Sequence, residues 1–344
     1  MTTLLTYVPS PGHTRAQHPE SHLRMTPLIP ALERSGVLGK VEMIVPEPAT
    51  IGQLRRVHTM ELIEYVHHLA LRGGGSLDHG DTYVTGESYE AARLAAGACA
   101  GAVDQIMIGN AHNGFALVRP PGHHAETDRV SGFCIFNNAA VAARQAQVTH
   151  GAKRVAIVDY DVHHGNGTQD IFFEDDSVLF VSTHLYAPYF YPGIGDMYEI
   201  GTGRGKNFTF NIPLPPYVGD RGYERVFDEL IEPRLKQFRP DLLLVSAGFD
   251  AHWQDPLAIS GLSLTGYAGI TRKLIDYANS LCAGKILFIL EGGYQHDVLS
   301  AGVTNVYHAL LGHDIIEDPI GSMPRNEHDI SDLIDRLKQH NLLN

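Results

Sequence analysis

The chain has 344 residues, of which 44% are hydrophobic and 19% charged, a balance typical of a globular protein with a sizeable core. Its 26 Lys and Arg residues against 39 Asp and Glu residues give a formal net charge of −13, which argues against the basic face of a nucleic-acid-binding protein. No apolar run reaches the roughly 18 residues that a membrane-spanning helix needs, so we expect no membrane partner.

The N-terminus and the cysteines bear on the compartment. Residues 1–5 lack the basic and apolar regions of a secretory signal peptide. The three cysteines, Cys99, Cys134 and Cys282, cannot all pair, and none lies in a CxxC motif. We therefore expect a reducing compartment, the cytoplasm.

Short apolar runs alternate with longer helical patterns along the chain. The runs predict strands over 4–8, 41–45, 115–118, 155–159, 178–182, 208–212, 242–246 and 286–290. The patterns between them predict helices over 51–71, 89–108, 137–150, 220–238, 265–282 and 298–311. Several runs are apolar on both faces, as parallel strands covered by helices are. The alternation predicts a doubly wound parallel α/β sheet.

The domain organisation follows from what separates these elements. No internal repeat or Pro/Ser-rich linker divides the chain, so we expect one domain over residues 1–344. The glycine-rich and polar stretch 73–83 predicts a loop. Residues 317–344 are charged and end in an amphipathic pattern over 330–343, which predicts a peripheral C-terminal helical segment.

Polar residues with glycines nearby follow five of the predicted strands. They lie at 119–124, 159–167, 182–184, 246–252 and 291–294. Ligands of open α/β sheets bind beyond the carboxyl ends of the strands. We therefore expect these five segments to meet at one rim.

Asp161 and His163 have the spacing of a metal site. Residues i and i+2 of an extended segment point to the same side, and Asp250 ends another strand. Two carboxylates and one imidazole leave an open coordination position, which is typical of catalytic zinc sites. Oxygen-rich ligation also suits Fe(II) or Mn(II), so the sequence predicts a metal more firmly than its identity.

Acid–base groups flank these ligands. Imidazoles transfer protons near neutral pH, and His123 and His124 follow a strand end. Asp159 and Asn166 could orient them, and the carboxylate partner would raise the basicity of its histidine. Tyr294, after two glycines, could donate a hydrogen bond to a developing oxyanion. Together these groups predict metal-assisted hydrolysis of an amide.

The motifs resemble those of the zinc-dependent histone deacetylase superfamily, which includes acetylpolyamine amidohydrolases and bacterial deacetylase-like amidohydrolases. The resemblance rests on RPPGHHA at 119–125, GFC at 132–134, DYDVHHGNG at 159–167, SAGFD at 246–250, DP at 255–256 and EGGY at 291–294. The RPPGHHA and EGGY forms resemble class II deacetylases, and residues 12–22 resemble a plant organellar and bacterial branch. The resemblance implies an arginase–deacetylase fold, an eight-stranded parallel sheet with helices on both faces.

The resemblance also implies roles for the site residues. It implies one zinc ion per chain, held by Asp161, His163 and Asp250. His123, paired with Asp159, is implied as the main base and His124 as its proton-transfer partner. Tyr294 is implied to contact the scissile carbonyl. Asn166 stands where class I enzymes carry aspartate, and class II enzymes commonly have asparagine there.

Structural potassium ions are a further implication of the family. One site maps onto Asp159, Ser182 and Thr183 together with the carbonyls of Asp161 and His163. A second site maps onto the carbonyls of Phe172, Asp175 and Val178.

The substrate is less well specified. The resemblance places Phe133 and Tyr191 as the aromatic walls of an acyl channel, with Gly293 beside the substrate. Asp81, in the loop before the helix predicted over 89–108, either holds a substrate amide or is an ordinary loop or helix-start residue. Leu257 stands where polyamine-selective members carry an acidic gatekeeper, and the chain is too short before residue 123 for their N-terminal insert. We therefore expect an acylated lysine of a peptide or protein, or a small N-acetyl amine, with acetylpolyamines as the alternative.

Three rival interpretations are weaker. An arginase-like ureohydrolase needs a second carboxylate two residues after Asp250, where this chain has His252. A protein that binds acyl-lysine without cleaving it should have lost a ligand or the tyrosine. The glycine-rich segment 201–206 precedes a predicted strand, not the helix that a phosphate-binding loop requires. The oligomeric state is left open.

Overall fold

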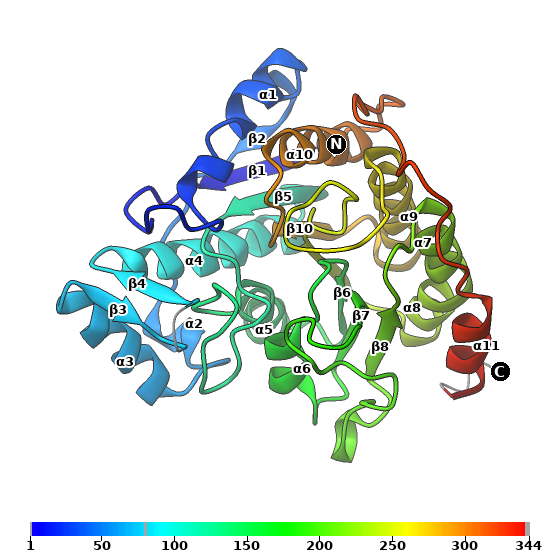
Figure 1. The fold of residues 1–344 in the computed structure, drawn as a ribbon. Helices are drawn as coiled ribbons and strands as arrows, with labels where there is room; N and C mark the ends of the chain where they lie inside the picture. Colours follow the sequence, from blue (N-terminus) through cyan, green and yellow to red (C-terminus); the bar gives the residue numbers. More distant parts are fainter. Residues whose placement is uncertain (1, 79–80, 341–344) are drawn as a thin grey trace.

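The computed structural model describes residues 2–78 and 81–340, and its centre is an eight-stranded sheet in the order β2-β1-β5-β10-β9-β6-β7-β8 (Figure 1). All neighbouring pairs in this sheet are parallel. The strands are β1 (Thr3–Val8), β2 (Glu42–Met43), β5 (Asn113–Val118), β6 (Val155–Asp159), β7 (Val178–Leu185), β8 (Thr209–Leu214), β9 (Leu242–Ala247) and β10 (Ile286–Leu290). Each coincides with a predicted strand, so the predicted sheet is confirmed.

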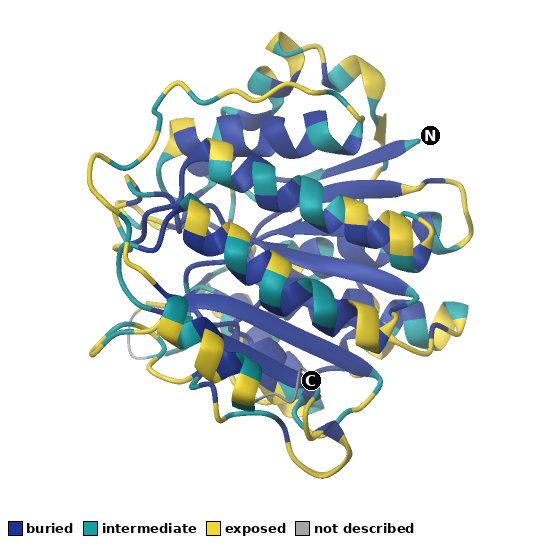
Figure 2. Cartoon of the chain, turned by 90° about the vertical axis from the view of Figure 1, so that its right-hand side faces the viewer, coloured by how far each residue is buried: buried dark blue, intermediate teal, exposed yellow. Residues whose placement is uncertain are grey.

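Helices cover both faces of the sheet and form two apolar cores. One core includes residues of α1 (Leu28–Arg34), α7 (Asp220–Val226), α8 (Glu232–Phe238), α9 (Leu264–Cys282), α10 (His296–Leu310) and α11 (Ser331–His340). The other includes residues of α2 (Ile51–Leu54), α3 (Met60–Leu71), α4 (Ser88–Met107), α5 (Asn138–His150) and α6 (Asn166–Phe172). Figure 2 shows the buried strands behind helices whose outer faces are exposed.

Alternation along each strand explains the two cores. In β1, Leu5 packs into the first core and Leu4 into the second, because successive side chains point to opposite faces. In β6, Val158 likewise packs into the first core and Ile157 into the second. The strands are therefore largely apolar on both faces, as the sequence predicted, although β1 and β8 carry the polar residues Thr6 and Asn211 within them.

Register brings three of these strand ends together. Asp159 at the end of β6 pairs with Ser182 of β7 on one side and with Ser246 of β9 on the other. The segments that follow β6 and β9 thus leave the sheet at the same level. β10 lies between β5 and β9, which places the segment after residue 290 beside both.

Two predicted helices are interrupted. The pattern over 51–71 forms α2 and α3 because Thr59 begins a new helix, its side chain accepting a hydrogen bond from Leu62 N. The pattern over 220–238 contains a π-helical turn over Phe227–Ile231 between α7 and α8. Pro233 in the first turn of α8 has no N–H to donate, which disrupts the α-helical hydrogen bonding there.

The structure also adds elements. The predicted loop over 73–83 lies in an antiparallel hairpin of β3 (Gly74–Ser76) and β4 (Tyr83–Thr85). The hairpin was not predicted, because the glycines and polar residues of this stretch gave no strand pattern. The short helices α1 and α6 were not predicted. The C-terminal helix is confirmed as α11 through His340, and its predicted end at 343 lies outside the described residues. Segment 201–206 forms a turn with a short 3-10 helix before β8, as expected for a turn.

Candidate active site

A cavity of about 500 Å³ opens at the carboxyl end of the sheet. The residues that line it include nine of the predicted site residues, Asp81, His123, His124, Phe133, Asp161, His163, Tyr191, Leu257 and Tyr294. They come from segments after β5, β6, β7, β9 and β10 and from the β3–β4 hairpin. Three of the five predicted rim segments, 119–124, 159–167 and 291–294, therefore contribute lining residues, and Asp250 of a fourth lies buried beside the lining residues Asp161 and His163.

The predicted metal ligands form one compact group. Ligand atoms of Asp161, His163 and Asp250 all lie within 4.8 Å of one another. His163 Nδ1 is 3.1 Å from Asp161 Oδ1 and 3.2 Å from Asp250 Oδ2. The remaining carboxylate oxygens accept backbone hydrogen bonds, Asp161 Oδ2 from Gly292 N and Asp250 Oδ1 from Val162 N. Each side chain thus keeps one donor atom directed at the shared centre.

This donor set fits a divalent zinc ion. Asp250 Oδ2 is buried and has no hydrogen-bond partner among the described residues, although a buried carboxylate oxygen normally has one. Burial opposes protonation of His163, yet the nearby carboxylates of Asp161 and Asp250 raise its pKa to about 10. The group therefore carries an excess of negative charge that a cation would offset. A Cβ on Gly292 would lie 2.1 Å from Asp250 Oδ2, so only glycine fits there.

The two adjacent histidines have different partners. His123 Nδ1 is 3.0 Å from Asp159 Oδ2, and His124 Nδ1 is 2.7 Å from Asn166 Oδ1. Asn166 Nδ2 donates to Glu126 Oε1, which fixes the amide so that its oxygen faces His124. His124 Nδ1 therefore carries the proton, and Nε2 keeps its lone pair.

The surroundings of the two histidines also shift their pKa values in opposite directions. Burial disfavours protonation of both rings, but the charges of Asp159 and Asp161 raise the pKa of His123 to about 10. Burial and the charges of His123 and His163 hold the pKa of His124 well below its usual value. The pKa values differ in the direction that the carboxylate and amide partners predict.

The loop that carries Tyr294 is fixed from two sides. Tyr294 N donates to Asp255 Oδ2 at 2.8 Å. Arg24 donates from Nε to the carbonyl of Gly293 and from Nη2 to the carbonyl of Glu291, at 3.0 and 2.5 Å. Its guanidinium carbon also lies 5.1 Å from the centre of the Tyr294 ring. Arg24 is fully buried, and sequence reasoning did not identify it.

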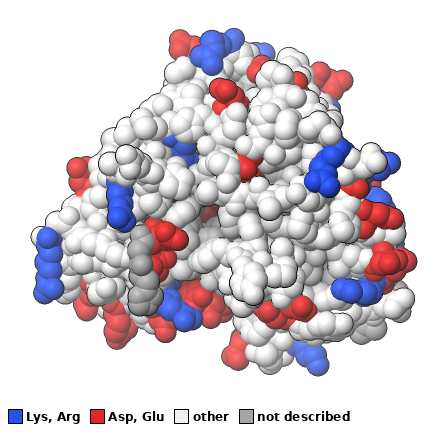
Figure 3. Space-filling view, viewed as in Figure 1, with Lys and Arg blue, Asp and Glu red and all other residues white. Residues whose placement is uncertain are grey.

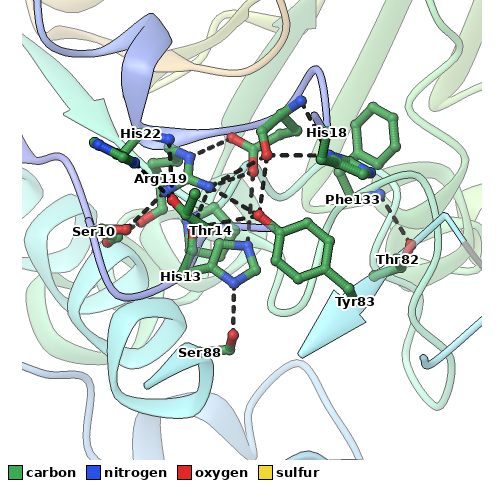
Figure 4. A network of polar contacts seen from close by, with 12 residues as sticks. Ser10, His13, Thr14, His18, His22, Thr82, Tyr83, Ser88, Arg119 and Phe133 are labelled. Atoms are coloured by element: carbon green, nitrogen blue, oxygen red, sulfur yellow. Dashed lines mark hydrogen bonds and ion pairs between the residues drawn. The ribbon is translucent and has the colours of Figure 1, made fainter. Parts of the chain in front are cut away.

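A buried ionic cluster around Glu20 connects Arg24 to Arg119, whose polar contacts are drawn in Figure 4. Glu20 accepts from Arg119 Nε at 2.6 Å and from Arg119 Nη2 at 2.8 Å, and lies 3.4 Å from Arg24 Nη1. Although burial opposes it, the charges of Arg119, His13 and Arg24 lower the pKa of Glu20. Tyr83 Oη donates to the Glu20 carbonyl. These partners lie far apart in the sequence, and no local signal reveals them.

Glu291 is a second buried carboxylate that the sequence did not single out. Its Oε2 accepts from Gly122 N at 2.7 Å and from His123 N at 3.2 Å, so it joins the Tyr294 loop to the histidine pair. Burial raises the pKa of Glu291 to about 7. His123, Cys134 and Glu291 also lie close enough to hold an ion, but burial raises the pKa of the Cys134 thiol well above its usual value, which disfavours the thiolate that binds a metal.

Aromatic rings form the cavity walls. Phe133 and Tyr191 line it as the resemblance implied, and Tyr191 meets His124 edge-on at 5.0 Å. Phe190, which we did not predict, stacks on His163 with centroids 5.1 Å apart and planes 6° apart. Three consecutive aromatic residues at 189–191, directly before Pro192, were the available signal. In Figure 3, uncharged atoms make up most of the surface around the centre of this face, and lysines and arginines are scattered.

The remaining predicted substrate residues have different environments. Leu257 lines the cavity, and its N–H donates to Asp255 Oδ1. Asp81 is exposed at the cavity mouth. Gly293 is not among the lining residues, because its carbonyl is turned to Arg24.

With this geometry in place, comparison with known proteins identifies the family. The model of the histone deacetylase domain matches residues 18–310. The chain belongs to the histone deacetylase family. It is therefore a hydrolase that acts on amides.

Relatives of this family member come from plants, archaea and bacteria. "Histone deacetylase 10, chloroplastic" of Oryza sativa subsp. japonica is 38% identical over 96% of this chain and 79% of its own. "Probable deacetylase" of Archaeoglobus fulgidus is 38% identical, with coverage of 89% and 86%. "Histone deacetylase-like amidohydrolase" of Pseudomonas aeruginosa is 38% identical, with coverage of 90% and 80%. The crystal structure of the HDA15 HD domain superposes with a TM-score of 0.89 at 38% identity, covering 99% and 94% of the two chains, which confirms the arginase–deacetylase fold.

The residues expected around potassium in this deacetylase lie behind the catalytic group. Asp159 and Ser182 are fully buried neighbours on β6 and β7, and Ser182 Oγ lies 2.9 Å from His184 Nδ1. Because His184 Nε2 faces the carbonyl of Gly195, Nδ1 accepts the Ser182 proton and leaves the hydroxyl lone pairs free for a cation. Phe172, Asp175 and Val178 lie between the end of α6 and the start of β7.

The ureohydrolase alternative gains no support from the position of His252. This side chain is buried, accepts from Gln254 N through Nδ1, and does not join the groups of possible metal ligands found among residues 2–78 and 81–340. In the same residues, no helix is long and apolar enough to cross a lipid bilayer.

Proposed function

We propose that the protein is a zinc-dependent deacetylase that releases acetate from acylated lysine side chains or small N-acetyl amines. The observation that carries this proposal is the convergence of Asp161, His163 and Asp250 beside His123 and Tyr294 at one cavity. Bound by the three ligands, zinc would polarise an acyl carbonyl and lower the pKa of a water molecule.

The chain's own residues supply the proton transfers. His124, which burial keeps uncharged, accepts at its free Nε2 the proton that the attacking water loses, because Asn166 holds Nδ1–H. His123, which the charges of Asp159 and Asp161 keep protonated, is the second proton-transfer group, so we assign the two roles in the opposite order to that implied by the resemblance. The Tyr294 hydroxyl donates a hydrogen bond to the carbonyl oxygen as negative charge develops on it. Arg24 and Asp255 hold the two polar groups of the peptide bond that precedes the tyrosine, the carbonyl of Gly293 and the N–H of Tyr294.

The cavity supports an aliphatic acyl-amine substrate. Phe133, Phe190 and Tyr191 offer apolar surface to a lysine-like stem. Asp78 and Asp81 also line the cavity, which favours cationic substrates and keeps acetylpolyamines as the second candidate. Leu257 provides no charge for a second amino group, so we rank acyl-lysine and small N-acetyl amines first.

The experiment is acetate release by the zinc-loaded protein on an acetyl-lysine peptide, an acetylpolyamine and an N-acetyl arylalkylamine. We expect turnover, with one zinc per chain by elemental analysis. Asp250→Asn should lose both zinc and turnover, and Asp241→Asn, far from the cavity, is the matched control. Bound zinc without turnover of any substrate would contradict the proposal.

We also propose structural potassium sites, a reducing compartment and a single domain. Structural potassium at the two predicted sites is supported by the burial of Asp159 and Ser182. A reducing compartment such as the cytoplasm is supported by three cysteines that are free and buried. A single domain is supported by the one sheet that the described helices cover.

A further inference from the structure

His18 joins the N-terminal segment to the mouth of the cavity (Figure 4). Its Nε2 lies 3.1 Å from the carbonyl oxygen of Asp81. Its Nδ1 lies 3.1 Å from both the backbone nitrogen and the carbonyl oxygen of Glu20. Because the Asp81 carbonyl can only accept, the Nε2 that faces it carries a proton. The ring therefore holds the Asp81 backbone by a directional hydrogen bond.

The same ring packs against the channel wall. It meets Phe133 edge-on, with centroids 4.7 Å apart and planes at 82°. It also meets Tyr83 at 4.8 Å and 70°. The Phe133 backbone is tied to the hairpin as well, because its N–H donates to Thr82 Oγ1 at 3.0 Å. His18 thus contacts both the Asp81 segment and the wall beside it.

The support behind His18 is rigid. Glu20, two residues on, is fully buried and paired with Arg119. Tyr83 Oη donates to the Glu20 carbonyl at 3.0 Å, which joins strand β4 to the same segment. A donor on a fixed base can set the position of a carbonyl on an exposed loop.

The Asp81 carboxylate is available for a ligand. It is exposed, lines the cavity mouth and has no hydrogen bond or ion pair to any side chain or backbone group in the described part of the chain. A carboxylate accepts N–H donors, and a peptide that carries acyl-lysine offers backbone N–H groups outside the channel. A small N-acetyl amine has no such groups.

We propose that His18 is a positioning residue that fixes the Asp81 carboxylate for the backbone amides of peptide substrates, and so selects peptides over small N-acetyl amines. This inference rests on the proposed deacetylase function. It assigns His18 no part in the bond-breaking step.

The test compares His18→Phe, which keeps a ring against Phe133 but has no donor, with His18→Gln, which can still donate. Each is assayed on an acetyl-lysine tripeptide and on N-pentylacetamide, which copies the acylated side chain without backbone amides. His18→Phe should raise KM for the tripeptide about three- to tenfold with kcat within twofold, since one hydrogen bond is lost. His18→Gln should restore most of this loss, and kcat/KM for N-pentylacetamide should not change in either variant.

A double-mutant cycle with Asp81→Ala completes the test. If His18 acts through Asp81, the double variant should bind the tripeptide no more weakly than Asp81→Ala alone. The inference would be overturned if kcat/KM fell equally on both substrates, if KM for the tripeptide did not change, or if the effects of the two substitutions on tripeptide binding were additive. The deacetylase function would stand in each case. A zinc-loaded wild type that turns over neither substrate would instead overturn the proposed function, and this inference with it.

Discussion

One phenol oxygen distinguishes tyrosine from phenylalanine at position 294. We expect Tyr294→Phe to lower kcat roughly 10²-fold, since a hydrogen bond made only to the developing oxyanion contributes about that much. Zinc content should stay at the wild-type level, because the proposed ligands are Asp161, His163 and Asp250. Steady-state kinetics with elemental analysis check both. Wild-type turnover in the variant would remove Tyr294 from the catalytic group.

Leu257 is an uncharged residue in the cavity wall, at the position where polyamine-selective relatives carry an acidic side chain. Its backbone N–H is held by Asp255 Oδ1, so Leu257→Glu should change the side chain without moving the chain. An exposed ion pair contributes up to about 1 kcal/mol, so kcat/KM for an acetylpolyamine relative to an acetyl-lysine peptide should rise several-fold. Leu257→Gln is the uncharged control. An equal shift in both variants would show that size, not charge, is read at this position.

Arg24 connects two elements, the segment before α1 and the loop after β10. Arg24→Met keeps an apolar stem but removes the donors to the carbonyls of Glu291 and Gly293. We expect kcat to fall more than tenfold with KM nearly unchanged, because the loop that positions Tyr294 loosens. Unfolding free energy should fall by about 3 kcal/mol, since a buried ionic cluster loses one member. Chemical denaturation and kinetics measure the two effects. Full activity would show that the loop holds its position without Arg24.

The sequence predicted elements where local pattern decides them. Each strand is a short apolar run, and the site residues stand at the ends of these runs, so the rim and its metal ligands could be inferred. Partners that meet only in the folded chain could not be. Arg24 and the Gly293 carbonyl are 269 residues apart, and Arg119 and Glu20 are 99 apart. The β3–β4 hairpin was missed because Gly74 and Gly75 carry no strand signal.

Across the whole molecule, buried neutral histidines make stability depend on pH. His58 donates from Nδ1 to the Glu126 carbonyl and accepts at Nε2 from Asn137 N, and burial lowers its pKa to about 4. The unfolded chain, with an ordinary histidine pKa near 6.5, binds the proton first as pH falls. The contribution of His58 is therefore complete above about pH 6.5 and is lost down to about pH 4, by up to about 1.4 kcal/mol per pH unit.

His58→Gln isolates this contribution, because an amide can serve both hydrogen bonds without titrating. Urea titrations at pH 7, 6 and 5 should show the wild type losing stability more steeply than the variant. If the wild type and the variant lose unfolding free energy equally as the pH falls, His58 does not titrate in this range.

Because β10 lies in the middle of the sheet, the sheet of a newly made chain can be completed only after this strand has been synthesised. Until residues 286–290 leave the ribosome, β2-β1-β5 and β9-β6-β7-β8 are separate sheets with four unpaired edges. Unpaired edges invite association with other chains, so a nascent chain that stalls before this strand is a substrate for chaperones and proteases. The segment carrying Gly292 and Tyr294 follows β10 directly. A chain that ends before β10 therefore also lacks Tyr294, because the strand that joins the two half-sheets and the tyrosine proposed to act in catalysis are made within a few residues of each other.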